Sequence, residues 1–206
     1  IIGEAGAAPI SHHGGGASTG EKLKLGDIFS RPVFWILVAC YLPMLALYGG
    51  VNQNLAPIAA SRGIDTQTAG TLLSLLSLAQ LIGTLVVGML SDRIGNRAPL
   101  AGLGLLTAAG GVLVAFGPGF PSLVAGAMLA GLGGGFWPLI AASIAREFGA
   151  AYVGRVFGLV ALFMPLNVFA PFLVAKAHET TGSYALPFMV LTALCIITAL
   201  ACALFM

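Results

Sequence analysis

The chain has 206 residues, of which 58% are hydrophobic and only 8% carry a charged side chain, and its mean hydropathy is +1.00. Soluble domains keep roughly a quarter of their residues charged, so this composition excludes a soluble globular protein and predicts an integral membrane protein. The net charge of +2 says little by itself. No basic run with interleaved aromatic residues indicates a nucleic-acid partner.

Residues 1–31 differ in composition from the rest of the chain and predict a cytoplasmic linker. The stretch up to Gly20 is rich in Gly, Ala, Ser and His, which is typical of a flexible connection. It shows neither the apolar run nor the cleavage site of a signal peptide. Because the chain begins without Met and ends on the apolar Phe205-Met206, we expect a fragment that starts in the linker of a longer protein, or a partial gene sequence.

Two short matches inside this linker are weak evidence for chemistry. Residues 16–20 fit the G-x-S-x-G pattern of hydrolases, but that motif needs a strand, a sharp turn and a helix around its serine. His12 and His13 are adjacent, and no further ligand follows at metal-binding spacing. We therefore expect no enzymatic activity, no bound metal and no cofactor.

Six apolar runs, bounded by turn residues and charges, follow the linker and form one predicted bundle at 32–206. A helix needs about 20 apolar residues to cross the ~30 Å hydrocarbon core, and these runs lack the strict alternation of barrel strands. The predicted fold class is an all-α membrane protein with six transmembrane helices. The expected spans are 32–60, 68–90, 98–116, 121–145, 155–175 and 185–206.

The placement of basic residues predicts the orientation of these spans. Six spans put both ends of the bundle on one side of the membrane, and that side holds seven of the nine Lys and Arg residues. By the positive-inside rule it is the cytoplasmic side of the cell membrane. The seven are Lys22, Lys24, Arg31, Arg93, Arg97, Arg146 and Arg155, and the other two are Arg62 and Lys176.

The first two spans carry polar residues on one face, as helices that line a water-filled path do. Tyr41, Tyr48 and Asn52 are seven and four residues apart, which places them on one face of a helix. Gln80 sits in a stripe of hydroxyl residues, for which hydrogen bonding between helices is the alternative role. The large amide of Gln80 is costlier to bury and predicts a substrate cavity. The stripe comprises Thr71, Ser74, Ser77 and Thr84.

Between the second and third spans, residues 88–97 read GMLSDRIGNR and interrupt the apolar sequence with charge. Gly88 lets a neighbouring helix approach closely, and Gly95 permits a tight turn. At the membrane edge, Asp92 can meet the positive N-terminus of another helix and Arg93 can pair with an acid. The pattern favours a conformational latch over the alternative that its arginines only fix the topology. Its charged residues are Asp92, Arg93 and Arg97.

This turn resembles the signature of the major facilitator superfamily, which reads approximately G-x-L-A-D-R-x-G-R-R/K. Ser91 replaces Ala, and Asn96 replaces the first basic residue of the closing pair. The resemblance covers 32–206 and implies the C-terminal six-helix half of a twelve-helix transporter, whose N-terminal half is the missing partner. It also implies that Gly154 and Arg155, at the start of the fifth helix, receive the matching turn of that half. The matching positions are Gly88, Leu90, Asp92, Arg93, Gly95 and Arg97.

The fourth and fifth spans contain residues that bend helices. A glycine run at 131–135 precedes Trp137 and Pro138, and the proline removes a backbone hydrogen bond near the glycines. Trp137 either lines the substrate path or fills the space that the glycines leave. Asn167 lies in mid-span between two prolines, where its amide and freed carbonyls can meet a polar ligand.

The third and sixth spans are poor in polar residues and are predicted to be peripheral, in contact with lipid and not with substrate. Thr107 is the one hydroxyl residue of the third span, and Thr192 and Thr198 are those of the sixth. The three cysteines lie in apolar spans without pairing or metal-binding spacing, so we expect small core or lipid-facing residues and no redox chemistry. They are Cys40, Cys195 and Cys202.

The cargo is the least constrained part of the prediction. Residues 154–159, GRVFGL, and 178–184, HETTGSY, are similar to the monocarboxylate and oxalate/formate branch of the superfamily. That similarity implies a small monocarboxylate-like organic anion, moved through the lipid bilayer by alternating access. No Asp, Glu, Lys, Arg or His lies near the middle of any span, so this half supplies neither a charge that holds a carboxylate nor a proton relay. If transport is coupled to protons, the titrating group belongs to the missing half or to the substrate.

Two alternatives to a monocarboxylate transporter stay open at this point. The first is an efflux pump for drug-like compounds, which the uncharged, aromatic-containing lining also fits. The second is a membrane scaffold or sensor that retains the fold without transporting anything.

Overall fold

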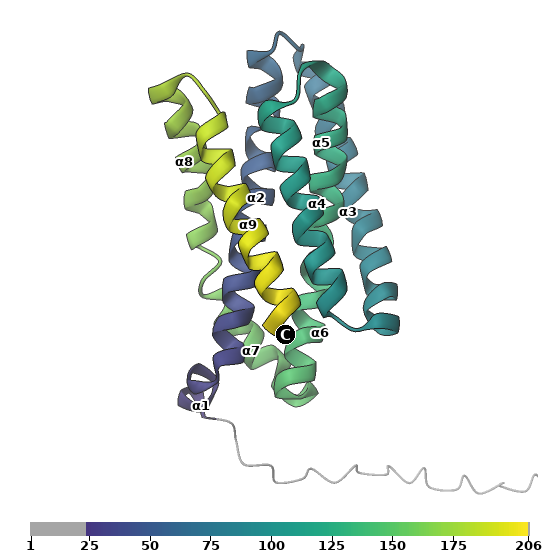
Figure 1. Ribbon diagram of the computed structural model, residues 1–206, viewed down its shortest axis with the longest axis vertical. Coiled ribbons are helices and arrows are strands. Elements are labelled where there is room, and N and C mark those ends of the chain that lie inside the picture. Colours follow the sequence, from purple (N-terminus) through teal and green to yellow (C-terminus); the bar gives the residue numbers. More distant parts are fainter. Residues whose placement is uncertain (1–23, 206) are drawn as a thin grey trace, which may run out of the picture.

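Six helical segments of membrane length run up and down through one bundle (Figure 1). The computed structural model describes residues 24–205, and every regular element in that range is a helix. The predicted all-α, six-helix membrane fold is confirmed. The elements are α1 (Leu25–Ser30), α2 (Pro32–Ser61), α3 (Thr66–Ile94), α4 (Arg97–Phe116), α5 (Gly119–Gly133), η1 (Gly134–Phe136), α6 (Trp137–Phe148), η2 (Ala150–Tyr152), α7 (Val153–Ala161), α8 (Leu166–Thr181) and α9 (Ala185–Phe205).

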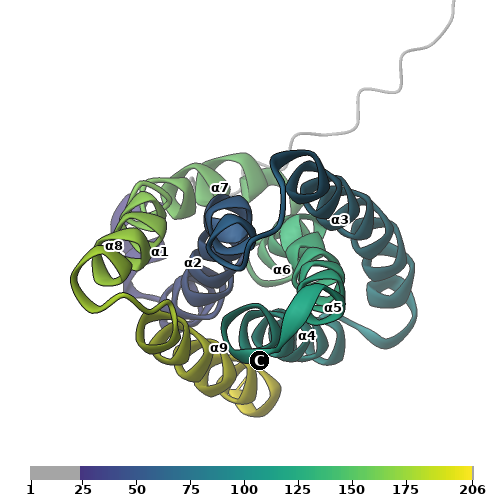
Figure 2. The ribbon, with the colours of Figure 1, turned by 90° about the horizontal axis from the view of Figure 1, so that it is seen from above.

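The first membrane helix forms the inside of the bundle. Seen from above, α8, α9, α4 and α3 follow one another around the outside, and α2 lies within them (Figure 2). Leu37, Leu47 and Leu55 of α2 are fully buried. At about 25 cal/mol per Å² of apolar surface, burying one such side chain away from water stabilises a fold by roughly 2 kcal/mol. In lipid, close van der Waals packing replaces part of that contribution.

Capping residues and glycines set the ends of the helices. Pro32 begins α2, because a proline in the first turn has no N–H that needs a partner. Asp65 caps α3, and its carboxylate accepts a hydrogen bond from the backbone N–H of Thr68 at 2.9 Å. Gly95 ends α3 with a φ of +79°, a conformation that a side chain disfavours. The tight turn after α3 is therefore built on this glycine.

Arg62 joins the far end of α2 to the end of α4. Its guanidinium donates hydrogen bonds to the carbonyl oxygens of Val114 and Gly117, the latter at 2.9 Å. These carbonyls belong to the last turn of α4, where no further backbone N–H is available to them. Partial burial lowers the pKa of Arg62 from its ordinary value, although the group stays charged at any physiological pH.

Two of the six membrane segments are interrupted along their length. The segment of α5 and α6 passes through the short 3₁₀ helix η1, where Gly135 has a non-helical ψ of 18°. The segment of α7 and α8 passes through a turn at 162–165, in which backbone hydrogen bonds span three residues instead of four. The first break lies in the predicted glycine run, and the second ends at Pro165, which cannot donate a backbone hydrogen bond.

α4 and α9 pack side by side on one flank of the bundle (Figure 2). Thr107 of α4 is fully buried and lies against Gly133 of α5, so its side chain does not face lipid. Thr192 of α9 is also buried and lies close to Gly111 of α4. Thr107 and Thr192 thus lie at contacts between helices, whereas Thr198 donates to carbonyls of its own helix. The contact of both helices with lipid and not with substrate stays a prediction.

A short helix occupies the end of the predicted linker. α1 places the fully buried Ile28 against the bundle, and the indole N–H of Trp35 donates to the carbonyl of Phe29 at 2.9 Å. Residues 1–23 of the linker lie outside the described residues. So do His12, His13 and the hydrolase-like match at 16–20.

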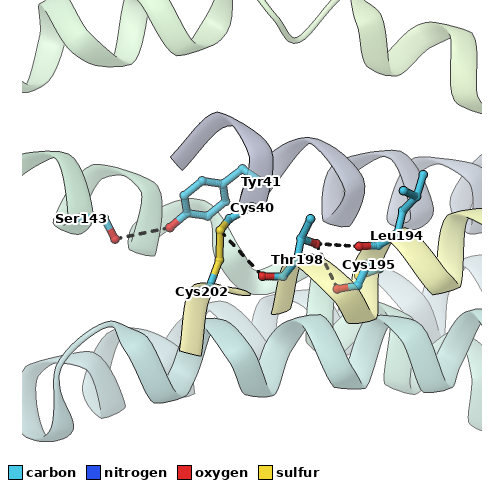
Figure 3. Close-up of a disulfide and its surroundings, with 7 residues drawn as sticks. All are labelled: Cys40, Tyr41, Ser143, Leu194, Cys195, Thr198 and Cys202. Carbon is cyan, nitrogen blue, oxygen red and sulfur yellow. Dashed lines mark hydrogen bonds between the residues drawn. A yellow bond between two sulfur atoms is a disulfide. The ribbon is translucent and has the colours of Figure 1, made fainter. Parts of the chain in front are cut away.

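The prediction of unpaired cysteines is wrong for two of the three. Cys40 of α2 and Cys202 of α9 form a disulfide, with their Cα atoms 6.4 Å apart (Figure 3). The two residues are 162 positions apart in the sequence, and only the packing of the last helix against the first brings them together. Cys195 is free and buried, and its thiol lies 3.4 Å from the carbonyl oxygen of Gly104.

Candidate substrate cavity and charged turn

Three predicted cavity residues meet at the break between α5 and α6. The hydroxyl of Tyr48 donates to Oε1 of Gln80 at 2.6 Å, and Nδ2 of Asn52 donates to the Tyr48 hydroxyl at 3.3 Å. The amide Nε2 of Gln80 in turn donates to the carbonyl oxygen of Gly134 at 3.5 Å. These four residues, named here the polar cluster, join α2, α3 and η1.

The glycines of the break make this approach possible. A Cβ atom on Gly134 would lie 2.5 Å from Cε2 of Tyr48, and one on Gly135 would lie 2.5 Å from the backbone carbonyl carbon of Gly83. No real side chain tolerates either contact. The glycine run therefore lets the backbone of η1 touch both the tyrosine ring and α3, and the break directs a carbonyl group toward Gln80.

The polar cluster offers hydrogen-bonding capacity without charge. Tyr48 is 8% exposed, and the side chains of Asn52 and Gln80 are half-buried. A primary amide has two donors and an acceptor oxygen with two lone pairs, so Asn52 and Gln80 both retain sites beyond the bonds described. Such a group can bind hydroxyl, carbonyl or carboxylate oxygens of a small solute.

The structure places Tyr41 in a different group from Tyr48. Its hydroxyl lies 3.4 Å from Oγ of Ser143 in α6, and Nδ2 of Asn96 donates to the same Oγ at 3.2 Å. All three residues are buried. Sequence reasoning missed Ser143 and treated Asn96 only as a departure from the superfamily signature. The replacement of a basic residue by Asn96 was the one sign of this contact in the sequence. An amide can be buried in a hydrogen-bonded contact inside the bundle, whereas burying a charged side chain there would cost much more free energy.

Trp137 and Asn167 lie outside the polar cluster in this structure. Trp137 is half-buried and stacks on Phe136, with ring centroids 5.4 Å apart. Asn167 lies in the first turn of α8, and its Nδ2 is 3.2 Å from the position of a Cβ on Gly49. Its Oδ1 is buried and has no hydrogen-bond partner within the described chain. A buried amide oxygen of this kind needs a ligand, a water or a second conformation to satisfy it.

The hydroxyl stripe of α3 does not bond to other helices. Thr71, Ser74, Ser77 and Thr84 each donate to a backbone carbonyl three or four residues earlier in α3 itself. Ser74 and Ser77 are exposed on the surface of the bundle. The structure therefore gives no support to the alternative that these residues join neighbouring helices.

The predicted latch residues lie at one end of the bundle, named here the turn end. The end of α3 and the start of α7 are both at this end, together with α1 (Figure 1). Asp92 and Arg93 are exposed on the last turn of α3, and Gly154 and Arg155 are exposed on the first turn of α7. Gly88 is half-buried. Arg97 lines a small hollow together with Arg146 and Glu147 of α6.

The basic residues of the described chain also gather at the turn end. Lys24, Arg31, Arg93, Arg97, Arg146 and Arg155 belong to the segments that meet there, whereas Arg62 and Lys176 belong to the opposite end. Within residues 24–205, no group of three or more His, Cys, Asp or Glu side chains has an arrangement that could hold a metal ion.

The helical architecture and the six helices of membrane length together define a multi-pass membrane protein. The sequence model of the Major Facilitator Superfamily matches residues 48–206. The chain belongs to this superfamily, and its six helices are consistent with one half of the superfamily fold. The predicted resemblance is confirmed. Proteins of this family are generally transporters and not enzymes.

Two relatives share a printed name. The chain is 31% identical over 116 residues to "Membrane sensor protein UhpC" of Salmonella typhimurium, a match that covers 54% of this chain and 25% of the relative. It is 30% identical over 107 residues to the protein of the same name from Escherichia coli, covering 50% of this chain and 23% of that protein. The matched part of the chain thus spans about a quarter of the length of each relative.

Proposed function

We propose that the chain forms one six-helix half of a secondary transporter, which moves a small organic solute across the cell membrane by alternating access. The N-terminal six-helix half is supplied by the rest of the protein, and both ends of the bundle are cytoplasmic. The polar cluster supports this proposal most directly. Discontinuous helices in transporters bring unpaired backbone groups to a binding site near the bilayer midplane, and Gly134 presents its carbonyl at such a break.

The cargo that we propose is a monocarboxylate-like organic anion. The amides of Asn52 and Gln80 supply donors for carboxylate oxygens, and the similarity of 154–159 and 178–184 to the monocarboxylate and oxalate/formate branch supports this class. A cationic partner for the carboxylate would belong to the other half, because the described spans carry their charged side chains only near their ends. Export of a drug-like compound is the alternative cargo.

A second candidate function is sensing. The printed names of the two relatives describe membrane sensors, and a sensor of this fold would bind its ligand at the polar cluster and change conformation without net transport. Binding would then be shared by both functions, and only solute movement would separate them.

The test is solute uptake by the full-length protein in proteoliposomes. Radiolabelled lactate, pyruvate, formate and oxalate are offered in turn, with and without unlabelled solute inside the vesicles. Gln80→Leu removes the amide at nearly constant volume, and Gln67→Leu makes the same change at an exposed position at the start of α3. We expect the first variant to lose uptake and the second to retain it. Equal uptake by both variants would exclude Gln80 from the site.

Labelling of single cysteines separates transport from sensing. Gln80→Cys and Asn167→Cys, in a background without the three native cysteines, are exposed to a membrane-impermeant thiol reagent. Thr107→Cys is the control, because Thr107 is fully buried between α4 and α5. We expect the first two to react and solute to protect them. Protection without any uptake would support a sensor, and labelling of neither in any conformation would refute the cavity assignment.

We further propose that the turn at 88–97 is a latch between the halves. Asp92 would face a helix start of the other half, and Gly154 and Arg155 would receive the matching turn from that half. A carboxylate at a helix N-terminus contributes ~0.3–1 kcal/mol when exposed and up to ~2 kcal/mol when partly buried. Asp92→Asn should therefore reduce cross-linking between cysteines on the two cytoplasmic faces. Unchanged cross-linking at equal expression would leave these charges with a role in topology alone.

A further inference from the structure

An apolar groove lies between α8 and α9, which are joined by the turn at 182–184 at the end of the bundle opposite the turn end (Figure 1). The groove has a volume of about 400 Å³, and pockets for small ligands have volumes of about 300–1,000 Å³. Leu173 and Val190 on its two walls are 60% and 52% exposed. The groove is therefore open to the surroundings of the bundle and large enough to hold a small ligand.

The groove is long, and the first membrane helix closes it toward the centre of the bundle. It runs along α8 from Leu166, at its inner end beside the helix break, to Ala177, at its outer end beside the turn at 182–184. At 1.5 Å per residue this stretch of helix is about 16 Å long. A Cβ atom on Gly50 of α2 would lie 3.5 Å from Leu191 and 3.8 Å from Val174, which both line the groove. Within residues 24–205, no polar side chain contributes to the lining.

An amide without hydrogen bonds lies at the inner end. Asn167 follows Leu166 and stands three and seven residues before Ala170 and Val174, so it shares one side of α8 with these lining residues. Its Oδ1 is buried and has no partner in the part of the chain that the structure describes, and its Nδ2 donates to no atom there. The amide thus lacks both a donor for its oxygen and an acceptor for its nitrogen.

A neutral carboxylic acid supplies both partners at once. Its O–H donates to an amide oxygen, and its carbonyl oxygen accepts from an amide N–H. The terminal torsion of an Asn side chain has a broad energy minimum, so the amide of Asn167 can turn both atoms toward such a group. An ionised carboxylate has no O–H, and its burial without a charged partner would be costly.

The outer end of the groove has no comparable site for a polar group. Lys176, which precedes Ala177, is already paired with Glu179, with Nζ and Oε2 3.2 Å apart. The hydrogen-bonding group of a ligand therefore belongs at the inner end, and its apolar part belongs along the groove.

We propose that this groove binds a carboxylic acid with one hydrocarbon tail, in its neutral form, with the carboxyl group on the amide of Asn167 and the tail toward Ala177. The inference rests on the carboxylate cargo of the proposed function, and it adds the tail, the protonation state and the place of contact. The anion takes up one proton from water before it enters. Because the bound acid is neutral, the groove needs no cation, and the described spans carry charged side chains only near their ends.

The orientation is tested by photolabelling the purified full-length protein in lipid nanodiscs and locating the labels by mass spectrometry. One derivative of decanoic acid carries a diazirine beside the carboxyl group, and the other carries it at the far end of the tail. We expect the first to label residues around Leu166 and the second to label residues around Ala177 and Pro187. Unlabelled decanoic acid should suppress both labels. The opposite order, in which the carboxyl end labels Ala177, is that of an ordinary membrane lipid and would overturn the proposal.

The carboxyl contact is tested at Asn167, with competition against the photolabel as the measure of affinity. Asn167→Leu should bind decanoic acid about fivefold less tightly or worse, the factor that corresponds to one hydrogen bond of ~1 kcal/mol. Methyl decanoate has no O–H and should bind the wild-type protein less tightly than the acid does. Equal affinities of the acid and the ester in acidic solution would exclude a contact between the acid and the amide.

The protonation state is tested by pH. The preference for the acid over the ester should be present at about pH 5 and lost at about pH 9, because the ionised acid no longer donates. Asn167 itself faces Gly49 of α2, and the ionisable side chains nearest in sequence to the outer end are Lys176, His178, Glu179 and Tyr184. His178→Gln should therefore leave this pH dependence unchanged. A preference that persists at about pH 9 would show that the bound form is the anion.

The tail contact is tested with two alanines of α8. Ala177 and Ala175 are both half-buried, but only Ala177 lines the groove. Ala177→Leu should weaken the binding of decanoic acid several-fold, because its side chain enters space that the tail would occupy, and Ala175→Leu should not. Equal binding by the two folded variants would show that the tail lies elsewhere. If Ala177→Leu does not fold, the positions of the two photolabels decide the question.

The results separate this inference from the proposed function. Uptake of lactate or pyruvate without competable labelling by decanoic acid would refute the groove site and leave the transporter in place. Labelling in the expected order without uptake of any carboxylate would support the groove site and refute transport.

Discussion

Adding one methyl group at Gly134 tests how the helix break shapes the polar cluster. Gly134 has φ −66° and ψ −9°, values that alanine adopts without strain. Its Cβ would lie 2.5 Å from Cε2 and 2.7 Å from Cδ2 of the Tyr48 ring. The ring must therefore move, and with it the hydroxyl that donates to Gln80 at 2.6 Å.

The expected loss of stability has two parts. Forcing one extra methyl group into a packed contact costs about 1–3 kcal/mol, and losing the hydrogen bond between Tyr48 and Gln80 costs about 0.5–1.5 kcal/mol. We therefore expect Gly134→Ala to lower the free energy of unfolding by about 2–4 kcal/mol. At about 2–4 °C for each kcal/mol, the melting temperature Tm should fall by roughly 4–16 °C.

The assay is thermal unfolding in detergent, followed with a thiol-reactive dye that labels the buried Cys195 when the bundle opens. Gly102→Ala is the control, because it also adds a methyl group to a helical glycine but at a position with open space. In a Tyr48→Ala background the obstructing ring is absent, so Gly134→Ala should cost little there. An equal loss of Tm with and without the Tyr48 ring would refute the reasoning.

Three further predictions follow from other contacts. Arg62→Gln should lower the free energy of unfolding by about 1–2 kcal/mol, because the carbonyls at the end of α4 lose a charged donor; an unchanged Tm would contradict this. Alkylation of the denatured protein should modify only Cys195 before reduction and all three cysteines after it, and mass spectrometry distinguishes the two states. Ser143→Ala should cost about 1–3 kcal/mol, because the buried hydroxyl and amide that it joins both lose a partner; thermal unfolding of this variant beside Ser143→Thr measures the loss.

The course of the chain through the membrane could be predicted closely from the sequence. Hydropathy places the third span at 98–116, and the helix runs over Arg97–Phe116. The reason is physical: the thickness of the bilayer fixes the length of each apolar run, and the backbone must satisfy its own hydrogen bonds in lipid. Glycine and proline also act locally, so the break at Gly134–Phe136 coincides with the glycine run.

The contacts between helices were harder to predict. Periodicity placed Tyr41 and Tyr48 on one face of α2, yet their hydroxyls meet Ser143 and Gln80, in different helices. Periodicity describes one helix at a time, whereas two turns of helix, about 11 Å, separate these residues along its axis. The pairing of Cys40 with Cys202 could not be predicted for the same reason, because it depends on how the last helix crosses the first.

The disulfide between α2 and α9 turns the six-helix unit into a covalent ring. Every loop between the membrane segments lies within that ring, because Cys40 and Cys202 are in the first and the last of them. A protease that cuts one of these loops would open the ring without releasing a fragment, and the nicked protein would separate into two pieces only after reduction. The six-helix unit could therefore be cut in any one of these loops and would still remain a single covalent molecule.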